Sequence, residues 1–181
     1  DNIKVTFRDA GHILGSSMIE IRYGGKKIVF TGDLGNSPAP LMKDTDVITD
    51  ATYLIMESVY GDRVHESVEE RKALLEDVIE DTVKRGGVLM VPSFSLERTQ
   101  VLLYEINSLV EHGRIPEVPV YVDSPLAIKV TEIYKRHAER FRATVRREIE
   151  GGDDIFNFPR LHFTLTTEES KAIANVPNPK I

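Results

Sequence analysis

The sequence contains no cysteine, which excludes disulfide bonds and every metal site that is built on thiolates. A bound metal would therefore be held by histidine and carboxylate side chains. No apolar run approaches the ~20 residues that a membrane-spanning helix needs, and no segment resembles a signal peptide. We therefore expect a cytoplasmic protein without a membrane partner.

An excess of basic residues is also missing. The formal net charge is -6, whereas proteins that bind nucleic acid usually carry a basic excess. Binding to nucleic acid would therefore require a local basic patch. The segment from Lys135 to Arg147 provides one, and it is either a solvated helix face or a surface that follows a phosphate backbone. Its basic residues are Lys135, Arg136, Arg140, Arg142, Arg146 and Arg147.

The 181 residues are 41% hydrophobic and 29% charged, which is typical of a globular protein with one domain or two small ones. The chain begins at Asp1, and Ile3 to Phe7 has the pattern of a strand that is already under way. Its last residues, 176–181, lead into what looks like another strand. We therefore expect a piece of a longer enzyme.

Short strands and turns are predicted for residues 3–57. Tyr53 to Met56 is a continuous apolar run, which is typical of a strand buried on both faces. Gly24 and Gly25 are suited to a hairpin turn between two strands with alternating side chains. The strands are predicted at 3–7, 18–23, 26–30 and 53–56, and residues 36–51 are predicted to form a loop.

Helical and strand patterns alternate in the rest of the chain. This alternation predicts a mostly parallel sheet with helices on its faces. Neither GxGxxG nor GxxxxGK[ST] is present, so no motif indicates nucleotide binding. The helices are predicted at 68–84, 96–110, 124–137 and 166–174, and the strands at 88–92, 118–122 and 161–164.

Two segments flanked by glycines place a potential metal ligand at the end of a strand. His12 lies within Ala10–Ser17, and Asp33 lies within Phe30–Asn36. Glycine lets the backbone turn sharply, so each ligand can face open space at a strand tip. Each alone is compatible with an ordinary turn. The other histidines lack ligand-like neighbours and are expected to be surface or packing residues: His65, His112, His137 and His162.

In this order and spacing, the two segments resemble the third and fourth metal motifs of the metallo-β-lactamase fold, in its nucleic-acid-processing branch. Residues 57–61, Glu-Ser-Val-Tyr-Gly, resemble motif A of the β-CASP family. Most DNA-repair nucleases of that family and RNase J carry aspartate there. Glutamate is more typical of the pre-mRNA 3′-end processing endonuclease and its archaeal and bacterial relatives. In the alternative interpretation, Glu57 caps the next helix or faces solvent.

Residues 91–100 resemble the P-x-F-[AS]-x-x-R-[AT]-Q turn of the same family. The turn leads from a strand into a helix and offers free amides, the hydroxyls of Ser93 and Ser95, and Arg98, which together suit a phosphate. Glu97 stands where relatives often carry glycine. In the alternative interpretation, Ser95 caps the helix and Arg98 pairs with a nearby acid.

The resemblance implies an α/β fold in two parts. Residues 1–60 would form part of a metallo-β-lactamase αββα sandwich, and residues 61–181 a Rossmann-like β-CASP cassette that is truncated at its C-terminus. It also implies two zinc ions, with His12 binding one and Asp33 bridging both. Glu57 would orient a histidine that protonates the leaving group. That histidine, the His-x-His-x-Asp-His motif and two later histidine motifs are not in this sequence.

The implied activity is zinc-dependent endonucleolytic cleavage of RNA. The resemblance is also compatible with an additional exonuclease activity and with a homodimer. On this interpretation Asp33 and Glu57 are catalytic, and Ser93, Ser95, Arg98, Arg140, Arg142 and Arg146 contact the substrate. Three alternatives remain: a DNA nuclease of the same superfamily, a lactamase-fold hydrolase of small esters or thioesters, and a non-catalytic scaffold subunit. The long α/β insert argues against the small-molecule hydrolase, and the intact His12, Asp33 and Glu57 argue against the scaffold.

Overall fold

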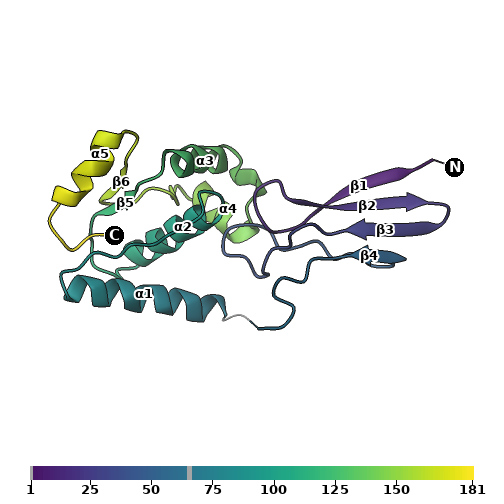
Figure 1. The fold of residues 1–181 in the computed structure, drawn as a ribbon, viewed down its shortest axis with the longest axis horizontal. Helices are drawn as coiled ribbons and strands as arrows, with labels where there is room; N and C mark the ends of the chain where they lie inside the picture. The colour runs from purple at the N-terminus through teal and green to yellow at the C-terminus, as the bar shows by residue number, and fades with distance from the viewer. Residues whose placement is uncertain (1, 65–66) are drawn as a thin grey trace. The chain divides into compact units, whose positions relative to one another are not determined.

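The computed structural model describes residues 2–64 and 67–181 (Figure 1). The chain divides into two compact units. The first consists of Asp1–Glu66 with Arg140–Ala143, and the second of Ser67–Glu139 with Thr144–Ile181. A linear division at residue 60 does not include the segment 140–143 that returns to the first unit. Among the described residues, no helix is long and apolar enough to cross a membrane.

The first unit is built on a four-stranded sheet in the order β1-β2-β3-β4. The first three strands pair antiparallel, and β4 pairs parallel with β3. Consequently β1, β3 and β4 run in one direction, and their C-terminal ends lie at the same edge of the sheet (Figure 1). The strands are β1 (Lys4–Asp9), β2 (Ser17–Tyr23), β3 (Lys26–Phe30) and β4 (Tyr53–Ile55).

The predicted hairpin turn is confirmed. Gly24 and Gly25 join β2 to β3 with φ angles of 54° and 74°, and two successive positive φ values match the twist of a hairpin. Burial alternates along β2 as in a half-buried strand, but the buried face is not the expected apolar one, because the polar Glu20 is buried beside Met18 and the apolar Ile19 is exposed. The core of this unit also includes residues of a loop, since Leu41 and Met42 are buried.

The segment 140–143 joins the first unit through specific contacts. Phe141 is fully buried and forms an isolated antiparallel bridge with Met42. The backbone amide of Arg142 donates to the Leu41 carbonyl at 3.1 Å, and its Nη1 donates to the Ala39 carbonyl at 2.5 Å. The loop that the sequence predicts at 36–51 is thereby fixed.

The prediction that residues 53–56 are buried on both faces is wrong. Leu54, Ile55 and Met56 are 55%, 49% and 58% exposed. The pattern of a continuous apolar run is typical of central parallel strands, whereas β4 is the edge strand of this sheet. Tyr53 and Ile55 on one face and Leu54 on the other are all about half exposed, so both faces of β4 are open.

The second unit contains helices and short parallel strands. The predicted α1 (Val68–Lys84) has the expected bounds, and Ser67 with Glu70 forms a capping box at its start. The capping box predicted at Thr166 is also confirmed, with Glu169 as its partner. The remaining elements are α2 (Arg98–Glu111), β5 (Val120–Val122), α3 (Pro125–Arg136), η1 (Ala138–Arg140), α4 (Ala143–Glu150), β6 (Leu161–Phe163), α5 (Thr167–Ala172) and η2 (Ile173–Asn175).

Four extended segments of the second unit lie side by side and parallel. β5 pairs with β6. On the other side of β5, the Ile181 amide donates to Pro119 at 2.9 Å, and the Tyr121 amide donates to Ile181 at 2.8 Å. Lys180 then forms a parallel bridge with Val88. The order is therefore 87–89, 180–181, β5 and β6.

The predicted buried strand at 88–92 is wrong. Within it only Val88 forms a bridge, and Met90 and Val91 are 82% and 41% exposed. This segment lies at the outer edge of the four parallel segments, so its side chains are not covered as those of a central strand would be.

The start of α2 depends on an unusual backbone at Glu97. This residue has φ 61° and ψ −55°, a left-handed conformation that favours glycine and costs other residues about 1–3 kcal/mol. Its carboxylate Oε2 accepts a hydrogen bond from the hydroxyl of Tyr134, a buried residue of α3, at 2.5 Å. The Glu97 side chain therefore ties the start of α2 to α3.

We predict that the effect of Glu97→Gly on stability depends on Tyr134. In the wild-type background, glycine relieves the backbone strain but removes an acceptor of a buried hydroxyl, which costs about 1–3 kcal/mol, so the net change should be small. In the Tyr134→Phe background no hydroxyl remains, and Glu97→Gly should raise the free energy of unfolding by about 1–2 kcal/mol. Urea unfolding of the four variants measures both effects. An equal effect in both backgrounds would show that the hydrogen bond does not offset the strain.

Candidate functional site

Three predicted site residues meet at one edge of the four-stranded sheet. His12 lies in the loop after β1, Asp33 follows β3, and Glu57 follows β4. The His12 Nε2 atom lies 3.9 Å from Asp33 Oδ2. The Glu57 Oε1 atom accepts a hydrogen bond from the backbone amide of Leu34 at 2.5 Å. The common direction of β1, β3 and β4 thus brings the three residues together.

The backbone around His12 is held by side-chain oxygens. Asp9 Oδ1 accepts from the Gly11 amide at 3.0 Å. Ser16 Oγ accepts from the amides of His12 and Ile13, each at 3.2 Å. The imidazole itself stays 40% exposed. A fixed backbone with an accessible ring is what a ligand or a catalytic base requires.

The loops of His12 and Asp33 touch through glycines. The Gly35 amide donates to the Ala10 carbonyl at 2.9 Å. A Cβ atom at Gly35 would lie only 1.7 Å from the Gly11 carbonyl oxygen, so no other residue fits there. Gly11 has φ 62°, which also favours glycine.

Glu57 connects the end of β4 to the Asp33 loop. Its amide donates to Thr31 Oγ1 at 3.3 Å, while its carboxylate accepts from Leu34. The Asp33 side chain is 77% exposed, so its oxygens are accessible. Ser67 caps α1, so the alternative in which Glu57 caps that helix is wrong.

The described residues supply part of a zinc site. Zinc lies ~2.0–2.2 Å from nitrogen and oxygen ligands and prefers a tetrahedral arrangement, so two ligands of one ion are about 3.3–3.6 Å apart. The separation of 3.9 Å between His12 Nε2 and Asp33 Oδ2 is a few tenths of an ångström longer, which a small rotation of the exposed Asp33 side chain would close. No group of three or more histidine, aspartate and glutamate side chains that could hold a metal occurs among the described residues. The pair fits a metal, but it is not a complete ligand set.

The remaining histidines have other surroundings. His65 lies outside the described residues. His112 Nδ1 lies 2.7 Å from the Ser108 carbonyl oxygen, and His137 lies 3.5 Å from Glu139 Oε1. The His162 ring stacks on Tyr121 with centroids 5.0 Å apart.

The turn before α2 differs from the expected phosphate site. The Arg98 amide donates to the Leu96 carbonyl at 2.8 Å and the Thr99 amide to the Phe94 carbonyl at 3.3 Å, so the expectation of free amides at this helix start is wrong for these two residues. Ser95 does not cap the helix, because the N-cap is Glu97. Ser95 Oγ instead lies 3.3 Å from Ser124 Oγ.

Two predicted substrate contacts of this turn remain accessible. Arg98 and Ser93 are exposed. Among the residues that the structure describes, none pairs with the Arg98 guanidinium, so the alternative that an acid neutralises it finds no support there. The Ser93 hydroxyl makes a long hydrogen bond of 3.4 Å to the Phe94 carbonyl.

The basic run from Lys135 to Arg147 is not one helix face. It covers the end of α3, then η1, then the start of α4. Arg140 and Arg142 belong to the first unit, and Arg146 belongs to the second. Arg142 binds the Ala39 carbonyl, so it has a structural contact. Arg146 Nε is buried and has no hydrogen-bond partner among the described residues.

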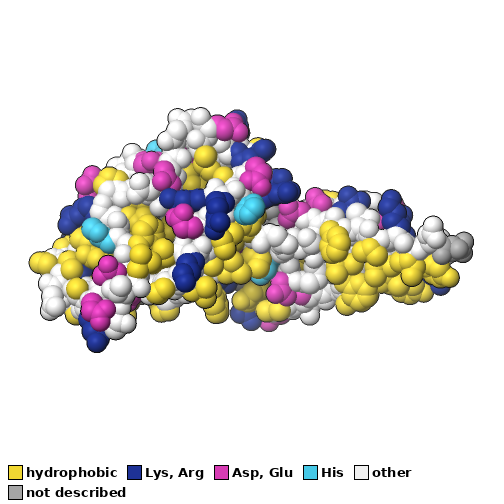
Figure 2. All heavy atoms as spheres, turned by 90° about the horizontal axis from the view of Figure 1, so that it is seen from above, with side chains coloured by type: hydrophobic (Ala, Val, Ile, Leu, Met, Phe, Trp, Pro, Cys, Tyr) yellow, Lys and Arg dark blue, Asp and Glu magenta, His cyan; other side chains and the backbone are white. Residues whose placement is uncertain are grey.

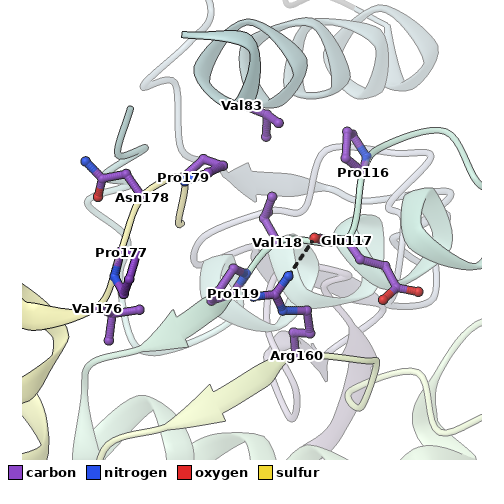
Figure 3. A pocket seen from close by; sticks show the side chains of 10 residues that line it. All are labelled: Val83, Pro116, Glu117, Val118, Pro119, Arg160, Val176, Pro177, Asn178 and Pro179. Atoms are coloured by element: carbon purple, nitrogen blue, oxygen red, sulfur yellow. Dashed lines mark hydrogen bonds between the residues drawn. The ribbon is translucent and has the colours of Figure 1, made fainter. Parts of the chain in front are cut away.

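A cavity of about 310 Å³ lies in the second unit, and none of the residues that line it is a predicted site residue (Figure 3). Arg160 donates to the Glu117 carbonyl at 3.1 Å across its wall. Its surroundings are mostly proline and valine, which offer no catalytic chemistry. It is lined by Val83, Pro116, Glu117, Val118, Pro119, Arg160, Val176, Pro177, Asn178 and Pro179.

Comparisons with known proteins place this arrangement in a family. Residues 99–181 match the Beta-Casp domain family. The chain is 33% identical over 180 residues to ribonuclease TTHA0252 of Thermus thermophilus. The matched region covers 99% of this chain and 41% of that protein. It is 37% identical over 155 residues to an RNase J-like protein of Methanocaldococcus jannaschii, covering 83% of this chain and 36% of that protein.

A eukaryotic relative is similar over an equal share of the chain. The cleavage and polyadenylation specificity factor subunit 3 of Dictyostelium discoideum is 33% identical over 152 residues, covering 83% of this chain and 20% of that protein. The chain therefore spans between 20% and 41% of the length of these three relatives. The family match and the relatives confirm the resemblance that the sequence motifs indicate: the chain belongs to the β-CASP family.

Proposed function

We propose that this chain is part of a zinc-dependent nuclease that hydrolyses RNA phosphodiester bonds. One observation carries the proposal: His12, Asp33 and Glu57 meet at one edge of the sheet, with His12 and Asp33 3.9 Å apart. The relatives support RNA as the substrate, since they are named ribonuclease, RNase J-like protein and cleavage and polyadenylation specificity factor. An endonuclease is favoured, because another relative is named endoribonuclease.

The four-stranded sheet would be part of a metallo-β-lactamase αββα sandwich. One of its faces is apolar and uncovered, and Figure 2 shows hydrophobic side chains gathered over this sheet. A sheet of a sandwich buries such a face against a second sheet, which supports the proposal. The parallel segments and helices of the second unit would form the Rossmann-like cassette. The exposed side chains of this face are Val5, Phe7, Ile19, Tyr23, Phe30, Tyr53 and Ile55.

Each residue of the edge has a proposed role. His12 Nε2 would bind one zinc ion, and the exposed carboxylate of Asp33 would bridge two. When bound, the ions supply a hydroxide at neutral pH and stabilise charge on the phosphodiester oxygens. Glu57 holds the Asp33 loop through Leu34 and would also orient a histidine that these residues do not supply. Such a carboxylate fixes the tautomer and raises the basicity of the ring.

The RNA contacts would lie on both units. Ser93, Ser95 and Arg98 present hydroxyls and a guanidinium rather than free amides, and Arg140 and Arg146 add positive charge. Arg142 would contribute less, because it already binds Ala39. A homodimer and a cytoplasmic location stay predictions. A scaffold subunit is disfavoured, because a chain without catalysis has no need of His12 and Asp33 in this geometry.

We predict that residues 1–181, prepared alone, bind no stoichiometric zinc and cleave no RNA. A catalytic zinc needs about three protein ligands, and the described residues supply only His12 and Asp33 for two ions. Elemental analysis after exhaustive dialysis measures the metal. Two tightly held zinc ions per chain would contradict the incomplete ligand set.

A second prediction separates the three residues of the edge in the whole protein. His12→Ala should lose zinc and RNA cleavage together. Asp33→Asn removes the charge that two dications need between them, so zinc content and turnover should both fall. Glu57→Gln should keep its zinc, since the glutamine oxygen can still accept from Leu34, while cleavage falls about 10–100-fold. Elemental analysis and cleavage of an RNA oligonucleotide measure these outcomes.

Further variants isolate the role of Glu57. Glu57→Ala removes the acceptor of the Leu34 amide and should loosen the metal as well. The defect of Glu57→Gln should be milder on a substrate whose leaving group needs no proton. Asp62→Asn, which changes an exposed carboxylate of the same unit, serves as the control and should change neither quantity. Loss of zinc from Glu57→Gln equal to that from His12→Ala would show that the proposed role is wrong.

The third prediction concerns the basic residues. In the whole protein, Arg140→Ala and Arg146→Ala should each weaken RNA binding and flatten the slope of log K against log salt by about one unit. Arg142→Ala should chiefly lower the free energy of unfolding, because it leaves the Ala39 carbonyl without this donor. Arg85→Ala, an exposed arginine at the end of α1, is the control. Unchanged slopes for Arg140→Ala and Arg146→Ala would assign these residues to the solvated surface.

A further inference from the structure

Phe94 presents an aromatic ring to solvent in the turn before α2. Its exposed fraction is 76%, and it lies between Ser93 and Ser95. Single exposed apolar side chains are common on proteins and need no explanation by themselves. Phe94 differs from them in the rigidity of its backbone and in the polar groups that surround it.

The backbone of Phe94 is held on both sides. Its carbonyl accepts three hydrogen bonds: from Thr99 Oγ1 at 2.8 Å, from the Thr99 amide at 3.3 Å and from Ser93 Oγ at 3.4 Å. On the other side, the Ser95 carbonyl accepts from Nε2 of Gln100, a fully buried residue, at 3.2 Å. The ring therefore stands on a fixed support, which reduces the entropy that its ordering would cost on binding.

The same turn carries a cation and hydroxyls. Arg98 is exposed at the first residue of α2, four residues after Phe94. Proteins that bind single-stranded nucleic acid combine cations that contact phosphates with aromatic rings on which bases stack. An exposed ring and an exposed guanidinium four residues apart in one turn match the two parts of a nucleotide, its base and its phosphate. A purely apolar partner would leave Arg98 buried without a counter-charge.

We propose that Phe94 stacks on a base of single-stranded RNA while Arg98 contacts an adjacent phosphate. This inference rests on the proposed function, since it names a binding position for the same substrate. Stacking tolerates any base, because every base has a π-face. Phe94 would therefore add affinity without specifying sequence.

Binding of a fluorescent single-stranded RNA to the whole protein tests the inference, in an Asp33→Asn background that limits cleavage. Phe94→Ala should raise the Kd about 5- to 150-fold, and Phe94→Leu should do nearly the same because it keeps apolar bulk without a π-face. Phe94→Tyr should bind within about threefold of the parent. Leu165→Ala removes another side chain of this unit that is 60% exposed, and it should not change the Kd.

The salt dependence distinguishes the two contacts. Phe94 carries no charge, so Phe94→Leu should leave the slope of log K against log salt unchanged, whereas Arg98→Ala should flatten it by about one unit. The fluorescence of a 2-aminopurine base in the RNA should be quenched on binding to the Asp33→Asn protein that retains Phe94, and it should be quenched less by the variant that also carries Phe94→Leu. If the parent binds no RNA, the proposed function fails. If the parent binds RNA and Phe94→Leu binds it equally well, the stacking role is overturned and the proposed function stands.

Discussion

The contact between Gly35 and Gly11 is the constraint on which the candidate site depends. Strand direction alone brings three loops to one edge of the sheet, but it does not set the spacing between them. The Gly35 amide binds the Ala10 carbonyl at 2.9 Å, and a Cβ at Gly35 would overlap the Gly11 carbonyl. The bond from Leu34 to Glu57 adds the third loop. Backbone contacts thus fix the positions of His12 and Asp33, and their side chains stay available for a ligand.

Local sequence signals predicted much of the fold. The glycine pair of the β2–β3 hairpin, the bounds of α1 and the capping box at Thr166 all follow from residues close together in the chain. Two wrong predictions about strands, at residues 53–56 and 88–92, concern burial. An apolar run has the same pattern in a central strand and at an edge, and only the neighbours of a strand decide how much of it is covered. Those neighbours are distant in sequence, so composition could not reveal them.

In the turn before α2, too, the sequence predicted which residues are present but not the contacts that they make. The motif resemblance located it and identified Ser93, Ser95 and Arg98, but it did not reveal which groups the turn uses for itself. The amides of Arg98 and Thr99 already donate to the carbonyls of Leu96 and Phe94. The start of the helix therefore has fewer amides that could bind an anion than the motif suggests. What the turn leaves accessible are side chains. Any attraction for a phosphate there rests mainly on the guanidinium of Arg98.

The charge of the chain limits how it could hold RNA. With a net charge of -6, long-range attraction to a phosphate backbone is weak, so affinity must come from close contacts. The basic run is also partly occupied, since Lys135 pairs with Asp154 at 3.2 Å and Arg142 binds Ala39. Few cations then remain for phosphates, and each contributes to the salt dependence of binding. Under these conditions an uncharged contribution, such as a base stacked on Phe94, would carry a larger share of the affinity than it does in a strongly basic protein, and binding would weaken less as salt rises.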